Sequence, residues 1–257
     1  MAIVSLLSIF CSIMTAQARI HSDVVEYVVD GTTFEGYVAY DDAASGARPT
    51  VLVVHDWMGM GDYARHRADQ LAALGYVAFA VDMYGKGVRP KNSEEASRLA
   101  GGLKGDRALL RRRIAGALDF IRRNRLVDQR HIAAIGYCFG GTVALELARM
   151  GADISGVVSF HGGLDTPTPA APNSIRAKVL VLHGADDPAA PAEQVSAFEK
   201  EMRDCGADWQ LVLYGGARHG FTNPASGNDV SRPVAYNAAA DRRSWIAMTD
   251  FFNELFK

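Results

Sequence analysis

The sequence predicts an α/β fold built on one doubly wound, mostly parallel sheet of about eight strands, with helices on both faces. Three observations predict it. Short apolar runs alternate with helix-like segments along most of the chain. Most of these runs are continuously apolar, as expected of parallel strands that are covered on both faces. Reactive side chains recur just after the runs, where the sites of such sheets lie.

The first part of the chain predicts a hairpin, followed by buried strands and a helix. Two alternating runs, 24–29 and 34–40, flank Asp30-Gly31-Thr32, which is typical of an antiparallel hairpin. Asp62 is expected to cap a helix that Gly75 ends. The continuous apolar runs predict strands at 51–54 and 77–81.

The rest of the chain continues the alternation. Apolar runs predict strands at 132–135, 157–160, 179–182 and 210–214. Helices are expected at about 94–99, 106–125, 142–150, 193–203 and 238–256. Two segments are expected to be loops: the glycine-rich 101–105, which lacks the ending of a phosphate-binding loop, and the proline-rich 166–172. Without an internal repeat, residues 19–257 are expected to form a single domain.

The N-terminus predicts export. Residues 2–16 carry no charge and are mostly apolar, and Ala16-Gln17-Ala18 follows them. This pattern predicts a signal peptide, residues 1–18, cleaved after Ala18. The run is shorter than the roughly 20 apolar residues of a membrane span, so no stable span is expected. The expected location is secreted or periplasmic. Because the stretch before the apolar run has no Lys or Arg, an uncleaved anchor and a cytoplasmic form stay open.

The composition is that of an ordinary globular protein. The 257 residues are 49% hydrophobic and 22% charged, with a net charge of −2, which does not suggest a nucleic-acid partner. The densest basic runs, 111–113 and 122–125, alternate with apolar residues and predict a solvated helix face. Of the three cysteines, Cys138 and Cys205 remain after cleavage and are not expected to pair. No zinc-binding spacing occurs.

The stretch Gly136-Tyr137-Cys138-Phe139-Gly140-Gly141 lies between an apolar run and a helix-like run. Glycine on both sides of a nucleophilic residue is the pattern of a nucleophile elbow, here with cysteine in the serine place. The chain must turn sharply from strand to helix, and small neighbours keep these elements from colliding. A helix N-terminus would favour the Cys138 thiolate. A buried structural cysteine is the alternative, and the glycine pattern favours the nucleophile.

An elbow nucleophile needs a base to take its proton and a carboxylate to hold that base. Five candidate residues fall just past predicted strand ends: Asp56, Cys138, His161, Asp187 and His219. Cys138, Asp187 and His219 stand in the chain order nucleophile, acid, histidine that α/β-hydrolases use. Taken singly, Asp187 also fits a turn or a helix cap, and His219 a loop histidine. Asp186 is a rival acid.

Five motifs follow predicted strands: His55-Asp56-Trp57, Asp82-Met83-Tyr84-Gly85, residues 136–141, Gly184-Ala185-Asp186-Asp187 with Pro191, and Ala217-Arg218-His219-Gly220-Phe221. With them the chain resembles the dienelactone hydrolase family of α/β-hydrolases over nearly all of its length after the signal peptide. The resemblance implies the α/β-hydrolase fold. It also implies that Cys138 is the nucleophile, Asp187 rather than Asp186 the acid, and His219 the base.

The resemblance further implies an oxyanion hole made by the backbone N–H groups of Trp57 and Phe139. The residue before Trp57 is a glutamate in the founding type of the family, where it holds the thiol and then helps to ionise it. Here it is Asp56, one methylene shorter. If Asp56 points at Cys138, its charge disfavours the resting thiolate and it modulates the thiol. If it is too short to reach, His219 alone activates Cys138.

A second departure from the family concerns the substrate. The founding type clamps a carboxylate substrate with arginines, one of them four residues after the base histidine. That position is Asn223 here, and neither Arg89 nor Arg218 maps onto a clamp. The hydrolytic chemistry therefore transfers to this chain more fully than the dienelactone substrate does.

These residues predict a hydrolase that cleaves a small-molecule ester or lactone through a thioester on Cys138. No cofactor or metal is implied, and the sequence predicts no oligomeric state. A thioesterase, acyltransferase or peptidase on the same fold stays open. So does a secreted ligand-binding protein with a vestigial site, although a complete set of Cys138, Asp187 and His219 weighs against it.

Overall fold

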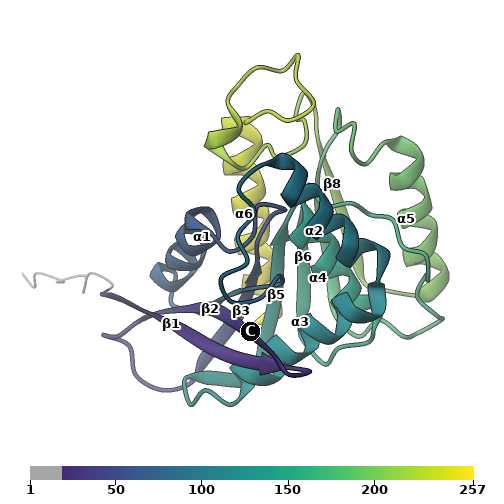
Figure 1. The fold of residues 1–257 in the computed structure, drawn as a ribbon. Coiled ribbons are helices and arrows are strands. Elements are labelled where there is room, and N and C mark those ends of the chain that lie inside the picture. The colour runs from purple at the N-terminus through teal and green to yellow at the C-terminus, as the bar shows by residue number, and fades with distance from the viewer. Residues whose placement is uncertain (1–18) are drawn as a thin grey trace, which may run out of the picture.

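One eight-stranded sheet runs through residues 19–257, the part of the chain that the computed structural model describes (Figure 1). The predicted signal peptide, residues 1–18, lies outside this part and stays a prediction. The strands are β1 (Ile20–Val29), β2 (Thr32–Asp41), β3 (Arg48–Val54), β4 (Val77–Val81), β5 (Val127–Tyr137), β6 (Gly156–Phe160), β7 (Lys178–Gly184) and β8 (Trp209–Tyr214). Their order is β1-β2-β4-β3-β5-β6-β7-β8. The pairs β1–β2 and β2–β4 are antiparallel and the other five are parallel, which confirms the predicted mostly parallel sheet.

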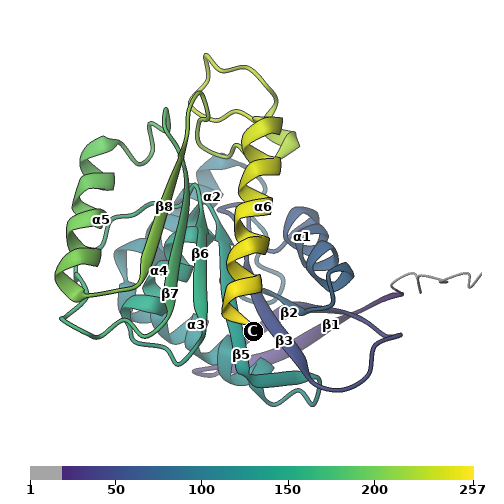
Figure 2. The same ribbon diagram turned by 180° about the vertical axis from the view of Figure 1, so that it is seen from behind.

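Helices cover both faces of the sheet (Figures 1 and 2). They are α1 (Asp62–Ala73), α2 (Ser93–Gly105), α3 (Arg107–Arg122), α4 (Phe139–Arg149), α5 (Ala192–Cys205) and α6 (Ala238–Leu255), with a 3₁₀ turn, η1 (Pro224–Ser226). Helices α1 and α6 pack on one face, and α3, α4 and α5 pack on the other. Strand β3 serves both apolar cores, because Leu52 and Val54 face α3 and α4 while Val51 and Val53 face α1 and α6.

Helix α2 corrects two predictions. It runs through Gly105, so the glycine-rich segment 101–105 is helical rather than a loop, and the helix is longer than the predicted 94–99. The Asn92 side chain caps it by accepting the Glu95 N–H at 3.0 Å. Ala96, Ala100 and Leu103 then bury one stripe of the helix. This cap and this burial offset the cost of helical glycine, which is about 1 kcal/mol per residue.

The helix ends show further differences from the sequence expectations. The N-cap of α1 is Gly61, without a side-chain cap, so Asp62 is the first helical residue and not the cap. Gly75 follows the end of α1 with φ +93°, as predicted. The predicted solvated face of α3 is partly wrong, because Arg111 pairs with the buried Glu146 and Arg113 donates to the Met83 carbonyl.

The topology collects the carboxyl ends of the parallel strands at one edge of the sheet. The loops after β3, β5, β6, β7 and β8 therefore meet there. They carry the five residues that the sequence placed just past strand ends. In the described part of the chain, no helix is both long and apolar enough to cross a membrane.

Candidate active site

The turn between β5 and α4 is a strained elbow with Cys138 at its apex. Cys138 adopts φ +55° and ψ −114°, a conformation that is uncommon for a residue with a side chain. A Cβ on Gly136 would lie 1.9 Å from the Gly140 carbonyl oxygen, and one on Gly140 would lie 2.3 Å from the Val54 carbonyl oxygen. The glycines are therefore required for strand, turn and helix to pack this closely, as the sequence predicted.

A chain of hydrogen bonds joins the predicted triad. His219 Nε2 lies 3.0 Å from Cys138 Sγ, and His219 Nδ1 lies 2.9 Å from Asp187 Oδ2. The other Asp187 oxygen accepts the Ala189 N–H at 2.8 Å, so the buried carboxylate is held on both sides. Asp186 is exposed and has no bond to His219. The structure thus brings together Cys138, Asp187 and His219 and leaves Asp186 outside the site.

The surroundings of His219 favour its charged form. Burial disfavours the imidazolium, but the charge interaction with Cys138 and the hydrogen bond to Asp187 raise the pKa of His219 to about 10. A protonated His219 lies 3.0 Å from the Cys138 sulfur, which places a positive charge beside that sulfur.

The loop after β3 brings Asp56 and Trp57 to the rim of the same pocket. The Asp56 carboxylate accepts the Met58 N–H at 2.8 Å, and burial raises the pKa of Asp56. Within residues 19–257, no hydrogen bond joins this carboxylate to Cys138 or His219. The Trp57 amide has no hydrogen-bond acceptor among the described residues, and Phe139 is the first residue of α4, where amides lack a helical partner. Both amides are thus available to a ligand.

His161 lies directly beside the triad, although the sequence assigned it no role. It follows β6 with φ +40°, and its Nδ1 accepts the Cys138 N–H at 3.2 Å. Its Nε2 lies 2.7 Å from Thr222 Oγ1, and Thr222 also meets the Tyr63 hydroxyl at 2.7 Å. Burial, and then the charge of His219, hold the pKa of His161 well below its ordinary value, so the ring stays neutral.

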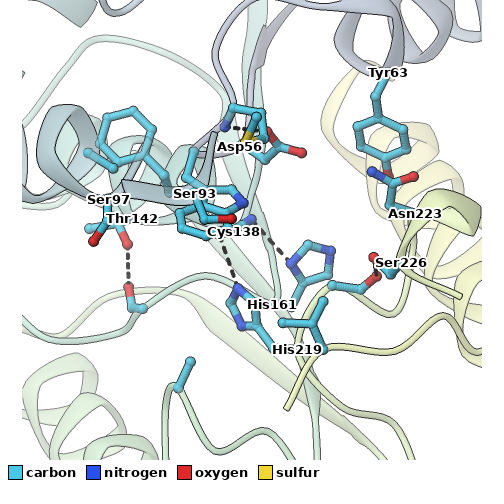
Figure 3. Close-up of a pocket in the computed structure, with 18 of the residues that line it drawn as sticks. Asp56, Tyr63, Ser93, Ser97, Cys138, Thr142, His161, His219, Asn223 and Ser226 are labelled. Atoms are coloured by element: carbon cyan, nitrogen blue, oxygen red, sulfur yellow. Dashed lines mark hydrogen bonds between the residues drawn. The ribbon is translucent and has the colours of Figure 1, made fainter. Parts of the chain in front are cut away.

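A cavity of about 760 Å³ is lined by Cys138, His219, His161, Asp56 and Trp57 (Figure 3). Ser93 and Ser97 of α2 stand with Thr142 on one side of Cys138, and Tyr63, Asn223 and Ser226 stand on the other. Apolar side chains contribute much of the wall: Trp57, Met58, Ala100, Phe139, Ala189 and Val234.

The cationic side chains that line the cavity are not the two arginines considered from the sequence, Arg89 and Arg218. Lys104 and Arg232 line the cavity, whereas neither Arg89 nor Arg218 does. Arg89 instead donates to the Gly85 carbonyl and pairs with Glu35. No sequence signal marked Lys104, because it lies in the segment expected to be a loop. Within residues 19–257, no group of three or more His, Cys, Asp or Glu side chains is placed to hold a metal ion.

The chain is similar to known hydrolases over most of its length. The model of the dienelactone hydrolase family matches residues 34–256. The solved structure of m3DLH is 40% identical, with a TM-score of 0.89 over 93% of this chain and 99% of that one. A dienelactone hydrolase-like promiscuous phosphotriesterase from metagenomic libraries is 41% identical, with a TM-score of 0.87 over 92% and 98%.

A curated relative supports the same assignment. The "Putative carboxymethylenebutenolidase" of Yersinia pestis is 26% identical over 91% of this chain and 89% of its own length. More distant structures, among them an α/β-hydrolase enzyme from a deep-sea metagenome library with a TM-score of 0.61, share the fold, which confirms the predicted α/β-hydrolase fold. The chain belongs to the dienelactone hydrolase family and is a hydrolase of the α/β-hydrolase fold.

Proposed function

We propose that the protein hydrolyses a small carboxylic ester or lactone by transferring its acyl group to Cys138 and then to water. The observation that carries the proposal is the chain from Cys138 Sγ through His219 to Asp187, with distances of 3.0 and 2.9 Å, at the wall of the cavity. Membership of the dienelactone hydrolase family and the carboxymethylenebutenolidase-like relative support it.

The first half-reaction forms a thioester. The Cys138 thiolate attacks the carbonyl carbon, and the carbonyl electron pair moves to oxygen, where the N–H groups of Trp57 and Phe139 stabilise the charge. As the intermediate collapses, the bond to the leaving oxygen breaks and the imidazolium of His219 gives that oxygen its proton. In a lactone the leaving oxygen stays tethered to the acyl group.

The second half-reaction restores the enzyme. Neutral His219 takes a proton from water, and the resulting hydroxide attacks the thioester carbonyl. The carbon–sulfur bond breaks, the carboxylic acid is released, and the thiolate and imidazolium return. The Asp187 carboxylate holds the imidazole in orientation and stabilises its charged form throughout.

A phosphotriester is the second candidate substrate. The observation that favours it is the 41% identity to the promiscuous phosphotriesterase over nearly the whole of both chains. The same thiolate would attack phosphorus in place of a carbonyl carbon, and the bond to the leaving oxygen would break as His219 protonates that oxygen. Water deprotonated by His219 would then attack phosphorus, breaking the phosphorus–sulfur bond and releasing the phosphodiester. A p-nitrophenyl phosphotriester tests this activity beside the carboxylic esters.

A substrate panel tests the proposal. Purified protein is assayed with p-nitrophenyl esters, alkyl esters, lactones, acyl thioesters and short peptides, before and after treatment with iodoacetamide. We expect hydrolysis of esters or lactones that alkylation abolishes. Folded Cys138→Ala and His219→Ala should each lose nearly all activity. If Cys138→Ala keeps more than about a tenth of the parental activity, Cys138 is not the nucleophile. A preference for thioesters or peptides would select those activities, and an unreactive Cys138 would indicate a vestigial site.

A further inference from the structure

His55 is a buried histidine next to the site, and the proposed mechanism does not use it. It follows β3 directly and is 1% exposed. Its Nδ1 lies 2.5 Å from the Asp56 carbonyl oxygen, and its Nε2 accepts the Met83 N–H at 3.1 Å. A carbonyl only accepts and an amide only donates, so the ring carries its single hydrogen on Nδ1. Burial lowers the pKa of His55, which keeps this neutral form.

The bond from His55 fixes the direction of the Trp57 N–H. The Asp56 carbonyl and the Trp57 N–H belong to one planar trans peptide group, in which C=O and N–H point in opposite directions. The Asp56 carbonyl oxygen also accepts the Gly59 N–H at 3.2 Å, which holds the same peptide group from a second side. The Tyr84 hydroxyl donates to the Trp57 carbonyl at 2.8 Å, so the next peptide group is held as well.

The same residue joins this peptide to the elbow. A Cβ on Gly140 would lie 2.6 Å from the His55 carbonyl oxygen, so the backbone of His55 packs directly on the first turn of α4. The His55 ring stacks on Phe139 with ring centres 5.9 Å apart. His55 therefore bonds to the peptide group that carries the Trp57 N–H and packs on Phe139, the two residues whose amides the proposed reaction needs.

We propose that His55 is a positioning residue that aims the Trp57 N–H at the oxyanion of the tetrahedral intermediate. The inference rests on the proposed acyl transfer through Cys138. A merely structural role would consist of the link to Met83, which ties the end of β3 to the end of β4.

Two substitutions separate these roles, because each keeps one of the two bonds. In His55→Asn the amide nitrogen takes the place of Nδ1 and can still donate to the Asp56 carbonyl. In His55→Gln the amide takes the place of Nε2 and can still accept the Met83 N–H. We expect His55→Gln to lose about 10²-fold in kcat with little change in KM, the usual effect of losing one oxyanion donor. His55→Asn should keep kcat within about tenfold of the parent.

Two further measurements exclude a general disturbance of the site. Alkylation of Cys138 by iodoacetamide forms no oxyanion, so both variants should react at the parental rate. A trifluoromethyl ketone that forms a tetrahedral adduct with Cys138 should bind His55→Gln more weakly, in parallel with kcat. Parental kcat in His55→Gln, or equal losses in both variants together with slowed alkylation, would overturn the inference.

The parent protein supplies a test that does not depend on the variants folding. Nitrogen NMR of the histidine rings should show His55 with hydrogen on Nδ1, and the Trp57 amide proton should shift downfield when the trifluoromethyl ketone adduct forms. A His55 ring with hydrogen on Nε2, or an unchanged Trp57 amide, would contradict the proposal. If the parent hydrolyses no ester or lactone, the proposed function fails. The His55 tautomer and the Trp57 amide shift on adduct formation still test the positioning role in that case.

Discussion

At the scale of single residues, Asp186 and Asp187 are neighbours with opposite surroundings. Asp187 is buried with its carboxylate 2.9 Å from His219, and Asp186 is exposed. We therefore expect Asp187→Asn to lower ester hydrolysis by about 10⁴-fold, because the amide can no longer stabilise the imidazolium. Asp186→Asn is the matched control and should keep parental kcat/KM. The reverse result would reassign the acid.

The charge of His219 predicts a pH dependence that varies with the leaving group. With a pKa of about 10, His219 is protonated at neutral pH and loses its proton as the pH rises through that value. An alkyl ester needs this proton on its leaving alkoxide, so its kcat/KM should fall as the pH rises through about 10. A p-nitrophenyl ester leaves without protonation and should decline less. An alkaline limb near the ordinary histidine range for the alkyl ester would contradict the assignment.

Asp56 offers a test of charge beside the thiol. Asparagine keeps the oxygen that accepts the Met58 N–H at 2.8 Å and removes only the negative charge. Because a like charge disfavours the thiolate, Asp56→Asn should shift the pH profile of alkylation by iodoacetamide to lower pH, while ester turnover drops. Asp56→Glu keeps the negative charge, so its alkylation profile should not move to lower pH. Parental alkylation of Asp56→Asn would mean that His219 alone activates Cys138.

The site residues that could be predicted are those marked by a sequence pattern within a few positions of them. The elbow glycines are needed within a few positions of Cys138, and Asp187 and His219 each follow a recognisable strand. The hydrogen bonds that hold His161 could not be predicted from a local pattern. Thr222 and Tyr63, which form them, lie 159 positions apart and meet only in the folded chain. His55 was visible as part of a motif, but its role depends on the direction of a peptide group, which a sequence does not show.

At the scale of elements, α2 shows how packing overrides a local pattern. Gly101, Gly102 and Gly105 gave the segment the composition of a loop, yet the buried stripe of Ala96, Ala100 and Leu103 makes it helical. The strands were predicted more reliably, because their continuous apolar runs arise from burial on both faces of the sheet. Their ends were less well predicted, since pairing with neighbours extends β5 and β7 beyond their apolar centres.

The same helix gives a matched pair of substitutions. A Cβ on Gly101 or on Gly102 would meet nothing within 4 Å, but only Gly101 lines the cavity. Alanine at either position should stabilise the protein by up to about 1 kcal/mol through helix propensity and unfolded-state entropy. Gly101→Ala should also lower kcat/KM for bulky esters relative to small ones, whereas Gly102→Ala should keep the parental profile. Equal substrate profiles in the two variants would mean that α2 does not contact the substrate.

At the scale of the whole molecule, a buried charge cluster joins three helices behind the site. The Glu146 side chain of α4 is fully buried and pairs with Arg111 of α3 at 2.7 Å and with Arg149 at 3.1 Å. Arg149 continues the cluster to Glu201 of α5 at 2.7 Å. Because these charges lie in a medium of low polarity, each depends on its partners far more than a surface charge does.

Glu146→Gln should therefore destabilise the whole fold. The neutral amide keeps the shape of the side chain but removes one of the two carboxylates that offset the charges of Arg111 and Arg149, so the free energy of unfolding should fall by about 3–5 kcal/mol. The control is Asp30→Asn, which breaks the pair with Arg112 on the same helix, α3, where the two side chains are 62% and 54% exposed. That change should cost less than about 1 kcal/mol. Urea unfolding of the parent and both variants measures the difference, and equal losses would contradict the stabilising role of the buried cluster.

At 25 °C folded Glu146→Gln should still hydrolyse esters, because the cluster lies behind the elbow and contacts none of Cys138, Asp187 and His219.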